Sequence, residues 1–187
     1  MEHKPEEKQA PGAKPVSELY QNVRTLATVL AVLILIFTFV ARIIVVSGPS
    51  MENTLFNGDA MLVWSLRYEP KQGDVVVLTQ PSYQEDSIVK RVIATGGQHV
   101  VIDYDNNKVI VDDHELTEDY IKEIMLVPSY GMGNHDLVVP DGHLFVMGDN
   151  RNESADNRYP TIGLIDERCV IGKALLGAFP FSRFVLL

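Results

Sequence analysis

The sequence lacks the features by which many hydrolases are recognised. Cys169 is the only cysteine among the 187 residues, which excludes an internal disulfide and a cysteine-based zinc cluster. There is no Gly-x-Ser-x-Gly nucleophile elbow and no His-Glu-x-x-His zinc motif. None of the five histidines belongs to a recognisable Ser-His-Asp pattern, and surface or hydrogen-bonding roles account for all of them. A catalytic serine would therefore need a base other than histidine.

Basic residues are scarce outside the N-terminal region. Residues 1–42 hold five basic and four acidic residues, whereas residues 43–187 hold 11 basic and 21 acidic ones, for a total net charge of -9. A nucleic-acid surface needs clustered Lys and Arg to contact phosphate. The acidic body therefore argues against nucleic acid as a partner.

Charge is absent from one long segment. Residues 25–41 are uncharged and nearly all apolar, and at ~1.5 Å per residue a helix of this length spans about 25 Å, enough to cross hydrocarbon. Arg24 and Arg42 flank it and can extend to the two interfaces. We expect a disordered cytoplasmic tail over residues 1–24, a transmembrane anchor over residues 25–46, and an extracytoplasmic domain over residues 47–187.

The orientation follows from the basic residues that precede the segment, because positive residues favour the cytoplasmic side. Those residues are Lys4, Lys8, Lys14 and Arg24. The expected localisation is thus the cytoplasmic membrane, single-pass, with the N-terminus inside. A cleaved secretory signal stays open, since Val46-Ser47-Gly48 fits a small-x-small cleavage site. A buried soluble helix is disfavoured, because the segment has no polar face. Ile43–Val46 fits either the end of the helix or the start of a strand.

The sequence pattern of residues 47–187 predicts a mostly β fold. Short runs rich in β-branched residues alternate with turn signals such as Asn57-Gly58 and Gly96-Gly97, which is typical of an antiparallel barrel or sandwich-like fold. We expect a hairpin at residues 103–108 and a short helical turn at Thr117–Glu123. The predicted strands are Ala60–Trp64, Asp74–Leu78, Ile88–Ile93, His99–Asp103, Lys108–Val111, His143–Met147 and Cys169–Leu176.

Two stretches could supply a nucleophile and a base. Gly48 and Pro49 bend and fix the backbone before Ser50, although Gly-Pro-Ser is also a common turn. In the predicted strand that contains it, Lys90 points the same way as Ile88 and Val92, so an apolar face carries an amine. Desolvation lowers the pKa of a lysine and makes it available as a base. The alternative is an edge lysine that guards against aggregation.

A third stretch is the most specific. Residues 148–158 place two aspartates, one glutamate, two arginines, three asparagines and a serine in one polar loop after an apolar strand. The loop could simply hold its own shape. It could also support a site, with Asp149 and Asp156 paired to arginines and Ser154 orienting the lysine; the candidate arginines are Arg91, Arg151 and Arg158.

Together these stretches resemble the bacterial type I signal peptidases, which are membrane-bound Ser/Lys endopeptidases. The motifs are Ser-Met-x-x-Thr-Leu at residues 50–55, Lys-Arg-Val-Ile at 90–93 and Gly-Asp-Asn-Arg-Asn-x-Ser-x-Asp-x-Arg at 148–158. Residues 171–174 and 179–183 also look like the C-terminal part of that family, in its compact Gram-positive form. The resemblance covers the apolar segment and essentially all of residues 43–187.

The resemblance implies a mostly β, antiparallel catalytic domain that removes signal peptides from exported preproteins at the outer membrane surface. It makes Ser50 the nucleophile, with its backbone N–H as one oxyanion donor, and Lys90 the general base. Ser154 would orient the lysine, and the residues that hold the site would be Arg91, Asp149, Asp156 and Arg158. The implied partners are signal peptides, membrane lipid and the protein-export machinery, and the resemblance implies no metal or organic cofactor.

The sequence departs from the family pattern at four places. Asn53 stands where many members have proline, and Gly48 where some have a serine that donates to the oxyanion. Residues 94–98 read Ala-Thr-Gly-Gly-Gln instead of Gly-Leu-Pro-Gly-Asp, and Asn157 replaces a serine. Two other functions remain as alternatives: a self-cleaving Ser/Lys peptidase of the repressor type, which is usually soluble, and a non-catalytic membrane-anchored β-module.

Overall fold

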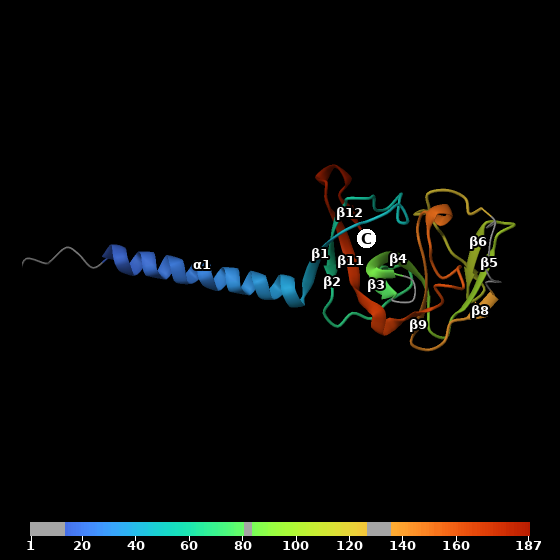
Figure 1. Cartoon of the computed structure of the whole chain (residues 1–187), viewed down its shortest axis with the longest axis horizontal. Coiled ribbons are helices and arrows are strands. Elements are labelled where there is room, and N and C mark those ends of the chain that lie inside the picture. Colours follow the sequence, from blue (N-terminus) through green and yellow to red (C-terminus); the bar gives the residue numbers. More distant parts are fainter. Residues whose placement is uncertain (1–13, 81–83, 127–135) are drawn as a thin grey trace, which may run out of the picture. The chain divides into compact units, whose positions relative to one another are not determined.

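The computed structural model describes residues 14–80, 84–126 and 136–187. It divides into two compact units, residues 1–38 and residues 39–187. Figure 1 shows the helix of the first unit and the strands of the second. Two of the five histidines, His3 and His135, lie outside the described residues, as does the part of the predicted tail before Lys14.

The described part of the first unit is helical, and its helix α1 spans Lys14–Phe39, so that the last helical residue belongs to the second unit. Its stretch Glu18–Phe39 has a mean hydropathy of 2.0 and is exposed throughout, so it is long and apolar enough to cross a membrane. The helix begins at Lys14, within the stretch expected as a tail, and it ends at Phe39. Of the two interpretations that the sequence left open for Ile43–Val46, the start of a strand agrees with the structure, because the β-branched residues after the helix belong to strand β1, Ala41–Val45.

The second unit is built on two antiparallel sheets (Figure 1). The larger has the order β1-β2-β11-β3-β4-β9-β10, with β12 paired to β11, and the smaller has the order β7-β6-β5-β8. The bounds in the larger sheet are β2 Ala60–Trp64, β3 Val75–Gln80, β4 Gln84–Thr95, β9 His143–Met147, β10 Ile165–Asp166, β11 Val170–Phe179 and β12 Val185–Leu186. Those in the smaller are β5 His99–Asp103, β6 Lys108–Val111, β7 His114–Glu115 and β8 Asp136–Val138. Three single-turn 3-10 helices complete it: η1 Arg151–Glu153, η2 Glu167–Cys169 and η3 Phe181–Arg183.

The mostly β fold class is confirmed. All seven predicted strands exist, four of them with the bounds expected, and Asp103 pairs with Lys108 at the predicted hairpin. The other three differ in their bounds: β3 and β11 each begin one residue later and end later than predicted, and β4 is longer at both ends. The expected helical turn at Thr117–Glu123 was wrong: that segment contains only turns and bends, with one backbone hydrogen bond of 3.2 Å from Ile121 N–H to the Glu118 carbonyl.

Two parts of the core position the chemistry-bearing stretches. Met51 and Leu55, which follow Ser50 in the sequence, are fully buried in a cluster with residues of β2 and β3. Ile88 and Val92 are buried in a neighbouring cluster with Val76 and residues of β9. The turn that carries Ser50 and the strand that carries Lys90 therefore both rest on packed apolar side chains.

Candidate active site

Ser50 lies on a tight turn just after β1. The Glu52 N–H donates to the Pro49 carbonyl at 3.0 Å, and the Leu55 N–H donates to the Met51 carbonyl at 2.8 Å. Gly48 has a φ of +91°, a conformation that glycine adopts without strain. Among the described residues no group accepts a hydrogen bond from the Ser50 N–H, so this amide is free to face a ligand.

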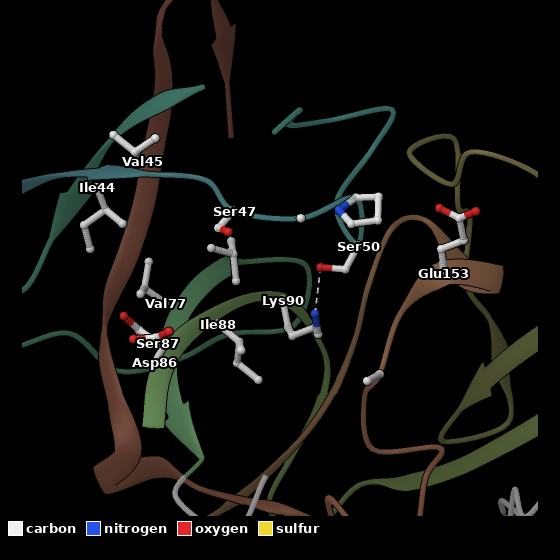
Figure 2. Close-up of a pocket in the computed structure, with 14 residues that line it drawn as sticks. Ile44, Val45, Ser47, Ser50, Val77, Asp86, Ser87, Ile88, Lys90 and Glu153 are labelled. Atoms are coloured by element: carbon white, nitrogen blue, oxygen red, sulfur yellow. Dashed lines mark hydrogen bonds between the residues drawn. The ribbon is translucent and has the colours of Figure 1, made fainter. Parts of the chain in front are cut away.

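Lys90 comes from the middle of β4 and reaches Ser50. Its Nζ lies 2.8 Å from Ser50 Oγ, and Figure 2 shows the two side chains pointing toward one another. The lysine is only 3% exposed, and Ile88 and Val92, which share its face of the strand, are buried too. The structure thus agrees with the prediction that Lys90 lies on an otherwise apolar face of its strand.

The surroundings of Lys90 favour its neutral form. Burial is the largest cause and lowers the pKa of the Lys90 amine to about 8. The carboxylates of Asp156 and Asp149 act in the opposite direction, while the positive charge of Arg158 lowers the pKa further. Removal from water, more than any single charge, therefore prepares this amine to accept a proton.

Ser50 and Lys90 open onto a cavity of about 490 Å³. On one side of the pair Figure 2 shows Ile44, Val77 and Ile88, and on the other side Glu153. The described residues that line the cavity include no histidine. The full lining is Ile44, Val45, Ser47, Gly48, Pro49, Ser50, Val77, Asp86, Ser87, Ile88, Val89, Lys90, Glu153 and Ala155.

Arg91 and Asp149 form a buried ion pair behind the site. Arg91 Nε and Nη2 donate to the two carboxylate oxygens of Asp149 at 2.8 and 2.7 Å. Arg91 Nη1 also donates to the Gly73 carbonyl at 2.8 Å, and Thr54 Oγ1 donates to Asp149 at 2.5 Å. The pair thus links β4 to the turn that carries Ser50.

A second buried pair shapes the loop after β9. Arg158 Nε and Nη2 donate to the carboxylate oxygens of Asp156 at 2.8 and 2.9 Å. The Gly148 N–H donates to the same carboxylate at 3.0 Å. The arginine and these hydrogen bonds hold the pKa of Asp156 below its usual range although the group is wholly buried. The Asp156 carboxylate therefore stays charged and holds this loop together through its hydrogen bonds to Gly148 and Arg158.

Comparison with known proteins identifies the family. The model of the family described as "Signal peptidase, peptidase S26" matches residues 19–179. The chain belongs to this family. The resemblance seen in the sequence is confirmed, and an apolar N-terminal helix in a member of it indicates membrane anchoring.

Three similar proteins illustrate the match. "Probable signal peptidase I-1" from Synechocystis is 34% identical over 94% of this chain and 90% of that protein. "Signal peptidase IB" from Staphylococcus aureus is 31% identical over 89% of this chain and 93% of that protein. A signal peptidase I structure from Enterococcus faecalis is 24% identical, with a TM-score of 0.47 over 57% of this chain and 97% of that one.

Ser154, the residue expected to orient the lysine, lies close to the turn but makes no hydrogen bond. A Cβ on Gly148 would come within 2.3 Å of Ser154 Oγ and 2.4 Å of the Ser50 carbonyl oxygen, so only glycine fits between them. The hydroxyl is buried without a partner of good geometry, although it is near enough to Asp156 to help lower the pKa of that carboxylate. The role of Ser154 therefore stays a prediction.

Several supporting residues could not be assigned from the sequence. Asn150 joins the loop to the turn through its N–H, which donates to the Ser50 carbonyl at 3.1 Å, and its side-chain amide, which donates to the Pro49 carbonyl at 3.1 Å. Arg151 pairs with Glu118, at 3.0 and 2.5 Å, rather than with either aspartate. The Gly-Asp-Asn-Arg motif is the only sequence signal that these residues gave.

Two departures from the family pattern have a local explanation. The Gly48 N–H donates to Asn57 Oδ1 at 3.0 Å, so this amide is occupied. Asn157 Oδ1 accepts from the Val146 N–H at 2.5 Å, and its amide donates to the Gly163 carbonyl, so the residue fastens the loop to β9. Asn157 thus makes contacts that serine is too short to make in full.

The Arg91–Asp149 pair predicts a large loss of stability on substitution. Asp149→Asn leaves Arg91 buried without a counter-charge, which typically costs about 3–5 kcal/mol. Urea unfolding of the full chain in detergent, followed by the fluorescence of the single tryptophan, Trp64, measures it. Asp166→Asn is the matched control, because its partner Arg168 is 89% exposed and the midpoint should not move. Equal midpoints for the two variants would contradict the argument.

Proposed function

We propose that this chain is a membrane-bound serine endopeptidase that removes N-terminal signal peptides from exported preproteins with Ser50 and Lys90. The observation that carries the proposal is the 2.8 Å contact between a buried amine of lowered pKa and a turn serine, in a cavity whose described lining contains no histidine. Family membership and the names of the similar proteins support the substrate class. They also favour a peptidase over a non-catalytic β-module or a repressor-type peptidase.

The reaction needs only the dyad and water. Neutral Lys90 accepts the proton of Ser50 Oγ while the oxygen attacks the scissile carbonyl, and the Ser50 N–H donates to the oxyanion. The lysine returns the proton to the leaving amine, and an ester remains on Ser50. Water, deprotonated by Lys90, then releases the signal peptide from the serine. Arg91, Asp149, Asp156 and Arg158 hold these groups in place, and Ser154 is proposed to steady the amine.

The sheet offers a place for an extended substrate. Among the described residues β1 pairs only with β2, which leaves its other edge without a partner strand there. Ile88–Lys90 pair with β3 on one side, and the pairing of β4 with β9 begins only at Arg91. Both free edges border the cavity, so a peptide can add as a strand beside them. The apolar lining from Ile44, Val77, Ile88 and Ala155 suits small side chains before the cut.

Membrane lipid is the second proposed partner. Ile43 pairs with Leu62 and Leu62 with Leu176, so these side chains share one face of the larger sheet. Ile43 is 64% exposed on that face, and Phe179 at its end is 58% exposed. Exposed apolar faces of this kind mark interaction surfaces. An apolar layer beside the cavity suits an enzyme whose substrates are themselves membrane segments, delivered by the export machinery.

The dyad is tested by single substitutions. Ser50→Ala removes the nucleophile and Lys90→Ala removes its base, so each variant should lose preprotein cleavage entirely while keeping the circular dichroism spectrum of the folded wild type. Cleavage of a purified preprotein, resolved on a gel, is the measurement. Full activity in Lys90→Ala would show that another group activates Ser50.

The pH dependence tests the mechanism. Because the lowered pKa leaves Lys90 protonated below about pH 8 and neutral above it, kcat/KM should rise as pH increases through about 8. Pre-steady-state kinetics must first show that acylation limits the rate. A limb near pH 6.5 that disappears on replacing a histidine would instead identify an imidazole base.

Orientation is tested by labelling in a Cys169→Ser background. An impermeant maleimide added to intact spheroplasts should label Asp113→Cys, which lies on an exposed turn of the β unit, and should label Lys8→Cys only after permeabilisation. The reverse pattern would place the cavity in the cytoplasm and remove the proposed access to exported preproteins.

A further inference from the structure

One segment without regular structure touches all three chemistry-bearing stretches. It is Glu118–Leu126, which follows β7 and is called the strap below. The sequence assigned it no role beyond a helical turn.

The strap is fastened to the Ser50 turn by Asn53. The side-chain Nδ2 of Asn53 donates to the carbonyl of Tyr120 at 3.1 Å and to that of Ile121 at 3.3 Å. Beside it, Lys122 Nζ lies 2.7 Å from Glu52 Oε2. The two residues before Thr54 are therefore both joined to the strap.

The strap also reaches the other two stretches. The Tyr120 ring stacks on the Arg91 guanidinium, whose Cζ lies 4.0 Å from the ring centroid. The Lys122 N–H donates to the Asp149 carbonyl at 3.1 Å, and Glu118 pairs with Arg151, whose side chain is 1% exposed. The same segment thus contacts the groups that hold Ser50 and those that hold Lys90.

Asn53 is the residue that suits this junction. Its φ is +93°, a conformation that asparagine and glycine tolerate and that the fixed φ of about -65° forbids to proline. A proline, which many family members have at this position, could stiffen the turn only in another backbone conformation. In this chain the Asn53 side chain instead connects the turn to the strap by hydrogen bonds.

We propose that the strap sets the position of Ser50 relative to Lys90 and that Asn53 is the positioning residue through which it acts. The inference rests on the proposed function, because it concerns the same dyad. Asn53 contacts neither the amine nor the cavity in the described structure. Its effect is therefore on the geometry of the attack and not on the pKa of the base.

Stability and geometry are separable at this site. The hydrogen bonds of Asn53 and the Lys122–Glu52 pair are solvent-exposed, and exposed contacts contribute little to stability. A displacement of about 1 Å in a reacting group, however, can slow catalysis by about a hundredfold. Loss of the tether should consequently reduce kcat in a protein that still folds.

The test compares two substitutions of Asn53 in the full chain. Asn53→Gly keeps the backbone conformation and removes the tether. Asn53→Asp keeps the shape and removes the N–H donor. Asp113→Gly is the matched control, since Asp113 also has a positive φ, of +65°, on a turn far along the chain from the three stretches. Preprotein cleavage is measured per active site, counted by complete acylation of Ser50 with a serine-reactive probe.

Both Asn53 variants should show kcat lowered by about tenfold to about a hundredfold, KM within about threefold, and an ascending pH limb where the wild type has it. Asp113→Gly should match the wild type. The proposal is overturned if kcat per site in Asn53→Gly stays within about twofold of wild type, or if only the fraction of folded sites falls. It is also overturned if Asn53→Asp keeps full kcat, or if the pH limb moves. Residual cleavage by Ser50→Ala would instead defeat the proposed function itself.

Discussion

The proposed chemistry depends on keeping one amine, that of Lys90, out of water. A lysine is charged at neutral pH unless its surroundings penalise the charge, and here an apolar strand face supplies that penalty. Burial alone would lower the pKa, but nearby unpaired charges could cancel or exaggerate the effect. Each buried carboxylate near Lys90 is therefore matched with an arginine, and desolvation remains the leading cause of the shift.

The alternation of a β-strand divides two tasks between neighbouring residues. Lys90 points to one face of β4, toward the cavity, and Arg91 points to the other, toward Asp149. Because Lys90 and Arg91 are neighbours on the same strand, the ion pair between Arg91 and Asp149 also holds the backbone at Lys90. The hydrogen bond from Thr54 to Asp149 connects this ion pair to the turn of Ser50. The side chains of these three residues thus support the proposed Ser50–Lys90 dyad without contacting its reacting atoms.

Much of this could be predicted from the sequence, and the limits have physical causes. β-branched runs such as Lys108–Val111 gave strands with correct bounds, because a half-buried pleat selects those residues. The two-residue strands β7, β10 and β12 were missed, since their pairing depends on tertiary contacts and not on a local pattern. The end of the helix could not be decided from the sequence, because Ile43 and Val45 suit both a membrane helix and an exposed strand.

The candidate site also contains residues that could be predicted from the sequence and residues that could not. Ser50, Lys90 and the aspartates belong to motifs with recognisable local chemistry, so they could be proposed in advance. Glu118 could not, because nothing near it in sequence shows that Arg151 needs a counter-charge once it is buried. Arg158 illustrates why such partners matter: it neutralises Asp156, and its own charge then disfavours the protonated amine of Lys90. The same guanidinium that holds the loop together thus also lowers the pKa of the proposed base, so one residue has both a structural and an electrostatic effect.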